Sequence, residues 1–130
     1  MGARITNAIF FLLFVYFAIV QYNDPDPLLW MILYAFVGIV ALLGVFQWYN
    51  RWLLLGGMAL FTGFFVWLLP SAITWITSPD MGAPFEMVPT EPAWMEETRE
   101  CLGALIGLAT LLTIWRFSVA FARKSGSAAQ

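Results

Sequence analysis

Two groups of oxygen-bearing side chains could do chemistry in this sequence, and their residue types suit a hard cation. One group lies in an early polar stretch and the other precedes the last apolar stretch; together they are Asn23, Asp24, Asp26, Glu96, Glu97 and Glu100. Carboxylate and carbonyl oxygens are the ligands that Ca²⁺ takes, in groups of roughly six to eight. Arg99 lies among the glutamates and argues against a cation, because the arginine would have to swing out of the site.

A structural network is the interpretation that we favour for these acids, with no metal bound. Arg99 is then expected to pair with an aspartate of the first group and with a glutamate of its own helix, because an unpaired guanidinium near hydrocarbon is expensive. The predicted network comprises Gln21, Asn23, Asp24, Asp26, Glu96, Glu97, Arg99 and Glu100. The alternative is a calcium site whose ligands are Asp24, Asp26, Glu96 and Glu100.

Missing residue types exclude several kinds of site. The chain has no histidine and a single cysteine, Cys101, which excludes within this chain a histidine-ligated haem, a His/Cys zinc site and a Ser-His-Asp triad. An intramolecular disulfide is also impossible, and Cys101 is expected to be a small buried residue. No nucleophile motif is present, so we expect no enzyme and no cofactor.

Composition identifies the class of protein that must position these residues. Of the 130 residues, 62% are hydrophobic and only 11% are charged, and the mean hydropathy is +0.81. Charged residues make up about a quarter of a soluble domain. The sequence therefore predicts an all-α integral membrane protein, a single transmembrane domain over residues 1–130 with room for about four spans of roughly 20 residues.

Turn residues divide the chain into four predicted helices, at about residues 5–22, 27–48, 52–77 and 92–122, with outer loops at 22–27 and 78–91. Asp26 and Pro27 suit the N-cap and the first position of the second helix. Pro70 lies inside the third helix and should kink it, opening a cleft walled by Trp67 and Trp75. Ser125 to Gln130 are expected to form a small, disordered polar tail.

Charge predicts the orientation of this bundle. Five of the six basic residues fall on one side of a four-span topology: Arg4, Arg51, Arg116, Arg123 and Lys124. All eight acids fall on the other side, together with Arg99. The positive-inside rule then places both termini in the cytoplasm and the acidic loops outside. No basic groove suited to nucleic acid is present.

Glycines mark the expected helix contacts. Gly103 and Gly107 are four residues apart on the last helix, and Gly56 and Gly57 lie early in the third. Small residues at such positions let membrane helices approach closely. We expect these four glycines to serve helix packing.

Two stretches of the chain resemble a known family. Gln21-Tyr22-Asn23-Asp24-Pro25-Asp26-Pro27, followed by Trp30 and Tyr34, and Glu96-Glu97-Thr98-Arg99-Glu100 with Gly103 are similar to the two signature stretches of the transmembrane protein 220 family. The resemblance implies a small four-helix membrane protein and locates a site at these stretches. It supplies no reaction.

Three classes of function remain open from the sequence. The favoured class is a non-catalytic accessory or scaffolding subunit of the cell membrane, or of the inner membrane in a bacterium, that packs against partner membrane proteins. Its aromatic helices would contact lipid, pigment or protein. The alternative is a binding or transport module that holds a divalent cation, and the third is an enzyme that uses paired carboxylates on a lipid-like substrate.

Overall fold

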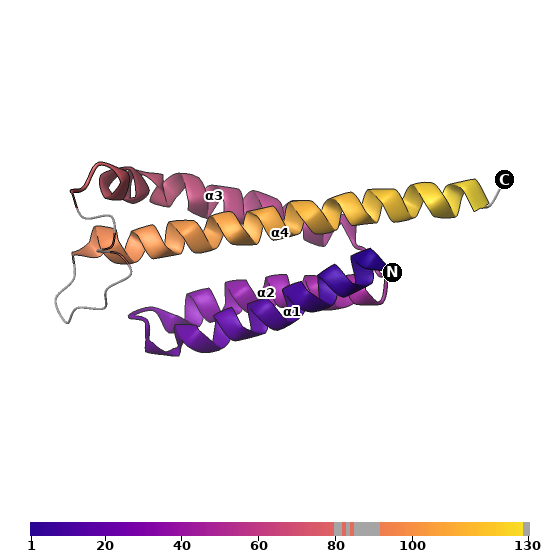
Figure 1. Cartoon of the computed structure of the whole chain (residues 1–130), viewed down its shortest axis with the longest axis horizontal. Coiled ribbons are helices and arrows are strands. Elements are labelled where there is room, and N and C mark those ends of the chain that lie inside the picture. The colour runs from indigo at the N-terminus through magenta and orange to yellow at the C-terminus, as the bar shows by residue number, and fades with distance from the viewer. Residues whose placement is uncertain (80–81, 83, 85–91, 129–130) are drawn as a thin grey trace. The chain divides into compact units, whose positions relative to one another are not determined.

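The computed structural model describes residues 1–79, 82, 84 and 92–128. Its helices are α1 (Gly2–Val20), α2 (Pro27–Val45), α3 (Arg51–Ile76) and α4 (Ala93–Ala128), with a short 3₁₀ helix, η1 (Gln21–Asn23), after α1. Each of the four α-helices is long and apolar enough to cross a membrane, and the described residues contain no strand (Figure 1). The prediction of an all-α membrane fold with four spans is confirmed. The cytoplasmic location of the termini stays a prediction.

The chain divides into two compact units. Unit 1 contains Met1–Gly57 and Ala109–Gln130, and unit 2 contains Met58–Leu108. Unit 1 therefore holds α1, α2 and the C-terminal part of α4, whereas unit 2 holds most of α3 and the N-terminal part of α4.

Aromatic side chains pack α1 against α2 next to the Asp-Pro loop. The ring of Phe14, which is fully buried, lies 5.4 Å from that of Phe17 and 5.9 Å from that of Tyr34. Tyr34 in turn lies 5.7 Å from Trp30. Offset aromatic pairs at such distances add to the burial of apolar area. This cluster fixes the hairpin whose connection carries Asn23, Asp24 and Asp26.

The opposite end of the same hairpin buries a polar residue. Asn7 of α1 is fully buried, and neither atom of its side-chain amide has a hydrogen-bond partner among the residues that the structure describes. Its amide lies against Gly44 of α2 so closely that a Cβ at position 44 would come within 2.5 Å of Asn7 Nδ2. Only glycine fits at this contact, which brings the beginning of α1 to the end of α2.

The end of α2 forms a Schellman motif without glycine. The Gln47 N–H donates to the Gly44 carbonyl at 3.1 Å, and the Trp48 N–H donates to the Leu43 carbonyl at 3.0 Å. Gln47 has φ of 60°, the left-handed conformation that this motif needs at the residue after the cap. A glutamine pays a steric cost there that glycine avoids.

Replacing Gln47 by glycine is therefore expected to stabilise the fold by about 0.5–1 kcal/mol. Thermal unfolding of the purified protein in detergent would measure the change. Phe46→Gly is the matched control, because the neighbouring Phe46 has φ of −84° and gains nothing from glycine. A Gln47→Gly protein that unfolds at a lower temperature than the parent would contradict the motif.

The α2–α3 connection also starts the next helix. Asn50 Oδ1 accepts hydrogen bonds from the backbone N–H groups of Trp52 at 2.9 Å and Leu53 at 3.2 Å. An asparagine at the N-cap satisfies donors that have no partner within the helix. Tyr49 precedes Asn50, and its hydroxyl donates to the Gly44 carbonyl at 3.4 Å. The centroid of the Tyr49 ring lies 5.9 Å from that of Phe121 on α4.

Pro70 does not end α3, which runs from Arg51 to Ile76 as one helix. Figure 1 shows the last turns of its ribbon changing direction. Hydroxyl groups after the proline bond back to the helix: Thr74 donates to the Pro70 carbonyl at 3.1 Å, and Thr77 to the Ile73 carbonyl at 3.0 Å. The carbonyl that Pro70 leaves without an N–H donor is that of Val66, four residues earlier, and neither of these threonine bonds is made to it.

The sequence predicts no helix in two segments, residues 78–91 and the tail after Lys124. The last helix continues to Ala128, so the predicted tail after Lys124 is wrong for residues 125–128. Helix growth is cooperative and no proline interrupts it there, so extension costs little. Of the predicted loop 78–91, residues 80–81, 83 and 85–91 lie outside the described residues, as do residues 129–130.

Candidate functional site

A line of polar contacts joins α3 to α4 within unit 2, immediately after Pro70. The Thr98 hydroxyl lies 3.0 Å from the Ser71 carbonyl and 2.6 Å from the Trp94 carbonyl. Thr98 is fully buried, and Ser71 is 9% exposed. The contact with Trp94 lies within α4, whereas the contact with Ser71 joins α4 to α3. A buried hydroxyl without a partner costs free energy, so the contact with Ser71 favours this packing of the two helices.

Glu97 adds a carboxylate to this line. The Ser71 hydroxyl donates to Glu97 Oε2, and Glu97 is half-buried. A bond to a charged acceptor is stronger than one between neutral groups. The serine hydroxyl thus donates to the carboxylate of the neighbouring helix and is largely covered.

Cys101 extends the contacts one turn further along α4. Its thiol lies 3.8 Å from the Phe65 carbonyl of α3, and the residue is 1% exposed. The thiol is a weak donor, so the contact is mainly one of packing. We call the contacts of Ser71, Glu97, Thr98 and Cys101 the polar seam.

Arg99 points to a different partner from those of the seam. Its Nη1 donates to the Pro84 carbonyl at 2.7 Å, and Pro84 is buried. The arginine therefore anchors a described residue of the segment between α3 and α4 to the first turns of α4. A charged donor is well suited to a buried carbonyl.

Gly107 of α4 and Phe61 of α3 form a second close contact between these helices, further along α4 than the polar seam. Gly107 of α4 faces the ring of Phe61 of α3, and a Cβ on Gly107 would overlap that ring. Phe61 is fully buried, so the ring has no free space into which to move. Of the other predicted packing glycines, Gly57 faces Phe36 and Leu111 within unit 1, Gly103 is buried, and Gly56 has open space beside it.

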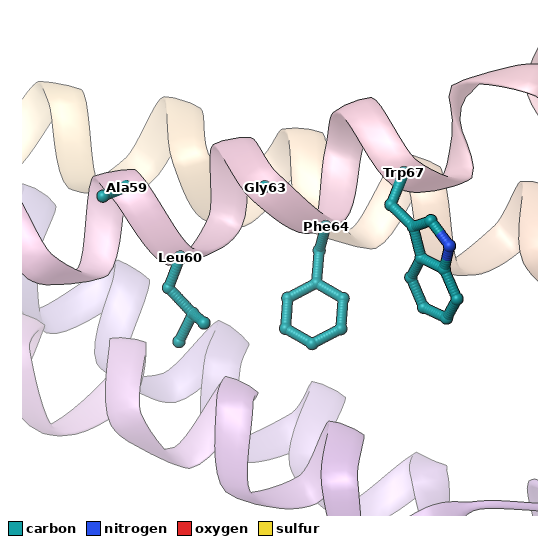
Figure 2. A pocket seen from close by; sticks show the side chains of 5 residues that line it. All are labelled: Ala59, Leu60, Gly63, Phe64 and Trp67. Carbon is teal, nitrogen blue, oxygen red and sulfur yellow. The ribbon is translucent and has the colours of Figure 1, made fainter.

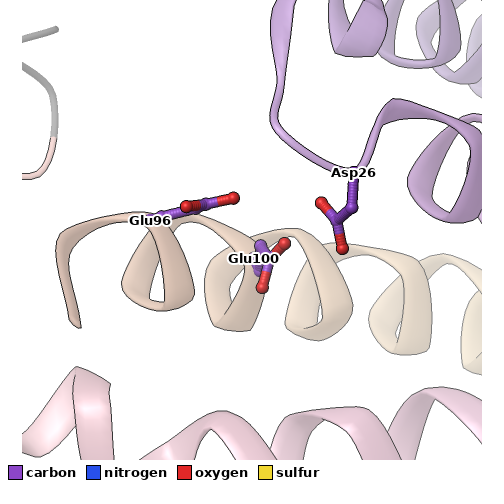
Figure 3. Close-up of side chains that lie close together, drawn as sticks. All are labelled: Asp26, Glu96 and Glu100. Carbon is purple, nitrogen blue, oxygen red and sulfur yellow. The ribbon is translucent and has the colours of Figure 1, made fainter. Parts of the chain in front are cut away.

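The predicted acidic residues lie in the connection between η1 and α2 and on α4. Figure 3 shows Glu96 and Glu100 on successive turns of α4 and Asp26 immediately before α2. Asp26 is the N-cap of α2 and Pro27 its first residue, although the Asp26 side chain makes no capping bond. Asp24 is half-buried and its N–H donates to the Gln21 carbonyl at 3.0 Å, whereas Asn23 is exposed.

The two sets of acids belong to different units. Gln21, Asn23, Asp24 and Asp26 are in unit 1, and Glu96, Glu97, Arg99 and Glu100 are in unit 2. Pairing of Arg99 with either aspartate, and a calcium site shared by both sets, therefore stay predictions.

Comparison with known families identifies the chain. Residues 13–116, most of the sequence, match the family described as transmembrane family 220, helix. The chain belongs to transmembrane family 220. The resemblance seen in the sequence is confirmed, and both signature stretches fall inside the matched residues of this family 220 chain. Neither a curated protein nor a solved structure matches it.

Two residues of the polar seam were not among the site residues predicted from the sequence. Ser71 follows Pro70 inside α3, and Thr98 lies between Glu97 and Arg99 of the second signature stretch. The feature of the sequence that could have indicated them is a hydroxyl group at each of these two positions. What the sequence lacked was the pairing, because the two residues are 27 positions apart and meet only when α3 packs against α4.

A hollow on α3 is the other candidate site in unit 2. It has a volume of about 330 Å³ and is lined by Ala59, Leu60, Gly63, Phe64 and Trp67. Figure 2 shows the larger side chains on one side of the helix, with Gly63 between Leu60 and Phe64. The predicted cleft was to be walled by Trp67 and Trp75, but Trp75 does not line this hollow, which precedes Pro70.

Proposed function

We propose that this family 220 chain is a non-catalytic accessory or scaffolding subunit of the cell membrane that packs against a partner membrane protein. The family and the four apolar helices make it a multi-pass membrane protein. The hollow on α3 is the observation that carries the accessory role. In the described part of the chain, no atom lies within 4 Å of the position that a Cβ on Gly63 would take, and Trp67 is 72% exposed beside it.

Small residues on a membrane helix serve close packing with another helix, because backbones can approach there and gain dispersion contacts. Gly107 uses this property inside the chain, whereas Gly63 does not. Ala59 and Gly63 are four residues apart and so lie on one face of α3. A partner helix that inserts a side chain between Leu60 and Phe64 would fill the hollow.

Filling the hollow tests this role. The tagged full chain is purified in mild detergent from its native membrane, and the mass and stoichiometry of the complex are measured for the parent and for Gly63→Trp. We expect the parent to migrate as a stoichiometric complex and the variant as the free chain. Val66→Trp is the control, because Val66 is 60% exposed on the same helix but does not line the hollow. A parent that migrates as a monomer would contradict an accessory role.

A second candidate is a membrane module that binds a divalent cation through the outer carboxylates. Glu96 and Glu100 are half-buried on one face of α4, one turn apart, and supply oxygen ligands of the type that Ca²⁺ takes (Figure 3). Calorimetric titration of the purified protein with Ca²⁺ tests this candidate. Binding by the parent that is lost in Glu96→Gln/Glu100→Gln would support it, and no heat from the parent would reject it.

A further inference from the structure

A chain of contacts gathers basic residues at one end of unit 1. Asn7 lies against Gly44, the Tyr49 hydroxyl donates to the Gly44 carbonyl, and the Tyr49 ring packs on Phe121. The beginnings of α1 and α3 and the last turns of α4 therefore lie at the same end. We define the basic end by its five charges: Arg4, Arg51, Arg116, Arg123 and Lys124.

The charges of the basic end have no counter-charge in the described structure. All five side chains are exposed, and none forms an ion pair or a hydrogen bond among the described residues. Arg51 makes a cation–π contact with the ring of Trp52, whose centroid is 5.1 Å from Arg51 Cζ. The acids of unit 1 are Asp24 and Asp26, which lie at the other end of the α1–α2 hairpin.

Three of the bases form a stripe on α4. Arg116, Arg123 and Lys124 are spaced i, i+7 and i+8, so they share one face of the helix, with the small residue Ala120 between them. Phe121, which packs on Tyr49, lies beside this stripe and holds it against the α2–α3 connection. The face thus presents fixed positive charge around a position without a bulky side chain.

The aromatic residues around the basic end suit the boundary between hydrocarbon and water. Trp48 is 58% exposed and Trp52 is 72% exposed, both in or next to the α2–α3 connection. Tryptophan is enriched at the level of lipid headgroups. The unpaired bases therefore lie where a membrane presents its phosphate groups.

We propose that the basic end binds the headgroup of an anionic phospholipid, with its phosphate on the α4 stripe. Charge complementarity selects this occupant over a zwitterionic lipid, because five positive charges have no anion of their own. Four of the five bases are arginines, whose planar guanidinium contacts two phosphate oxygens at once. This inference does not depend on the proposed accessory role.

The test compares lipid retention by the full chain in two lipid mixtures. The protein is placed in nanodiscs of phosphatidylcholine with or without phosphatidylglycerol, extracted into mild detergent, and its retained lipids are counted by native mass spectrometry. We expect the parent to retain phosphatidylglycerol preferentially and to unfold at a higher temperature with it. Each basic residue near an anionic surface contributes about fivefold to binding, so Arg116→Gln/Arg123→Gln/Lys124→Gln should lose roughly a hundredfold of this preference.

The matched control is Ser125→Gln/Ser127→Gln, which places glutamines on the same exposed turns without changing charge. It should retain phosphatidylglycerol as the parent does. Unfolding in phosphatidylcholine alone shows that the triple variant is folded, since its three side chains are exposed. Equal retention of the two lipids by the parent would overturn the proposal and favour an acidic protein segment as the occupant. Unchanged preference in the triple variant would also overturn it.

Discussion

Replacing Gly107 by alanine is expected to destabilise the protein by about 1–3 kcal/mol. The added Cβ would overlap the Phe61 ring, and that ring is fully buried, so α3 and α4 must move apart to accept it. The polar seam depends on the same helix separation and would be stretched as well. The free energy of unfolding, measured by titration with a denaturing detergent, would give the size of the loss.

The same substitution at Gly63 is the control, because a Cβ there would meet no described atom within 4 Å. Alanine is the better helix former by about 1 kcal/mol, so Gly63→Ala should be neutral or stabilising. Combining Gly107→Ala with Phe61→Leu should recover part of the loss by removing the ring. If both alanine variants have the stability of the parent, the close contact between Gly107 and Phe61 is absent from the protein.

Replacing Arg99 by alanine is expected to cost about 2–3 kcal/mol, because it strips the buried Pro84 carbonyl of its charged donor. It also removes the one base from the acidic side of the predicted topology. Thermal unfolding in a zwitterionic detergent measures the effect. Arg123→Ala is the control, because Arg123 is exposed and its loss should change stability by no more than about 0.5 kcal/mol.

Charge reversal separates the two predicted roles of Arg99. Arg99→Glu alone should be less stable than Arg99→Ala, because it adds a negative charge among glutamates. Adding Asp24→Arg should recover part of this loss if the first loop and α4 share one network. No recovery would contradict a network shared with the first loop, and a fully stable Arg99→Ala would contradict the role of Arg99 as an anchor of the Pro84 carbonyl as well.

Sequence reasoning succeeded where a single residue acts on its own segment. Pro27 and Asp26 predicted the beginning of α2, and long apolar runs predicted four helices, because proline geometry and hydrocarbon length act locally. The end of α2 lacked such a signal. Gln47 adopts the left-handed conformation usually taken by glycine, and the surrounding contacts impose that conformation.

The candidate site was only partly predictable for a related reason. Glu97 and Arg99 stand out as charges beside an apolar stretch, so the sequence places a site there. Ser71 and Thr98 are ordinary residues in sequence and gain their roles from a partner on another helix. The basic end divides in the same way, because the sequence alone places its five charges on one side of the bundle, whereas the contacts of Tyr49 with Gly44 and Phe121 depend on tertiary packing.

The buried amide of Asn7 bears on how the protein is made. A helix that emerges from the ribosome alone would expose this amide, one turn from Arg4, to lipid as it leaves the translocon, and polar groups there oppose insertion. In the folded hairpin, the Asn7 side chain is fully buried and its amide lies against Gly44. Because α2 is the most hydrophobic of the four spans and follows within a few residues, α1 and α2 are expected to enter the bilayer as a pair. Gly44, which permits the close packing of α1 and α2, would then also govern biosynthesis. We expect Gly44→Leu to lower the yield of membrane-inserted chain, separately from any effect on the stability of the folded protein.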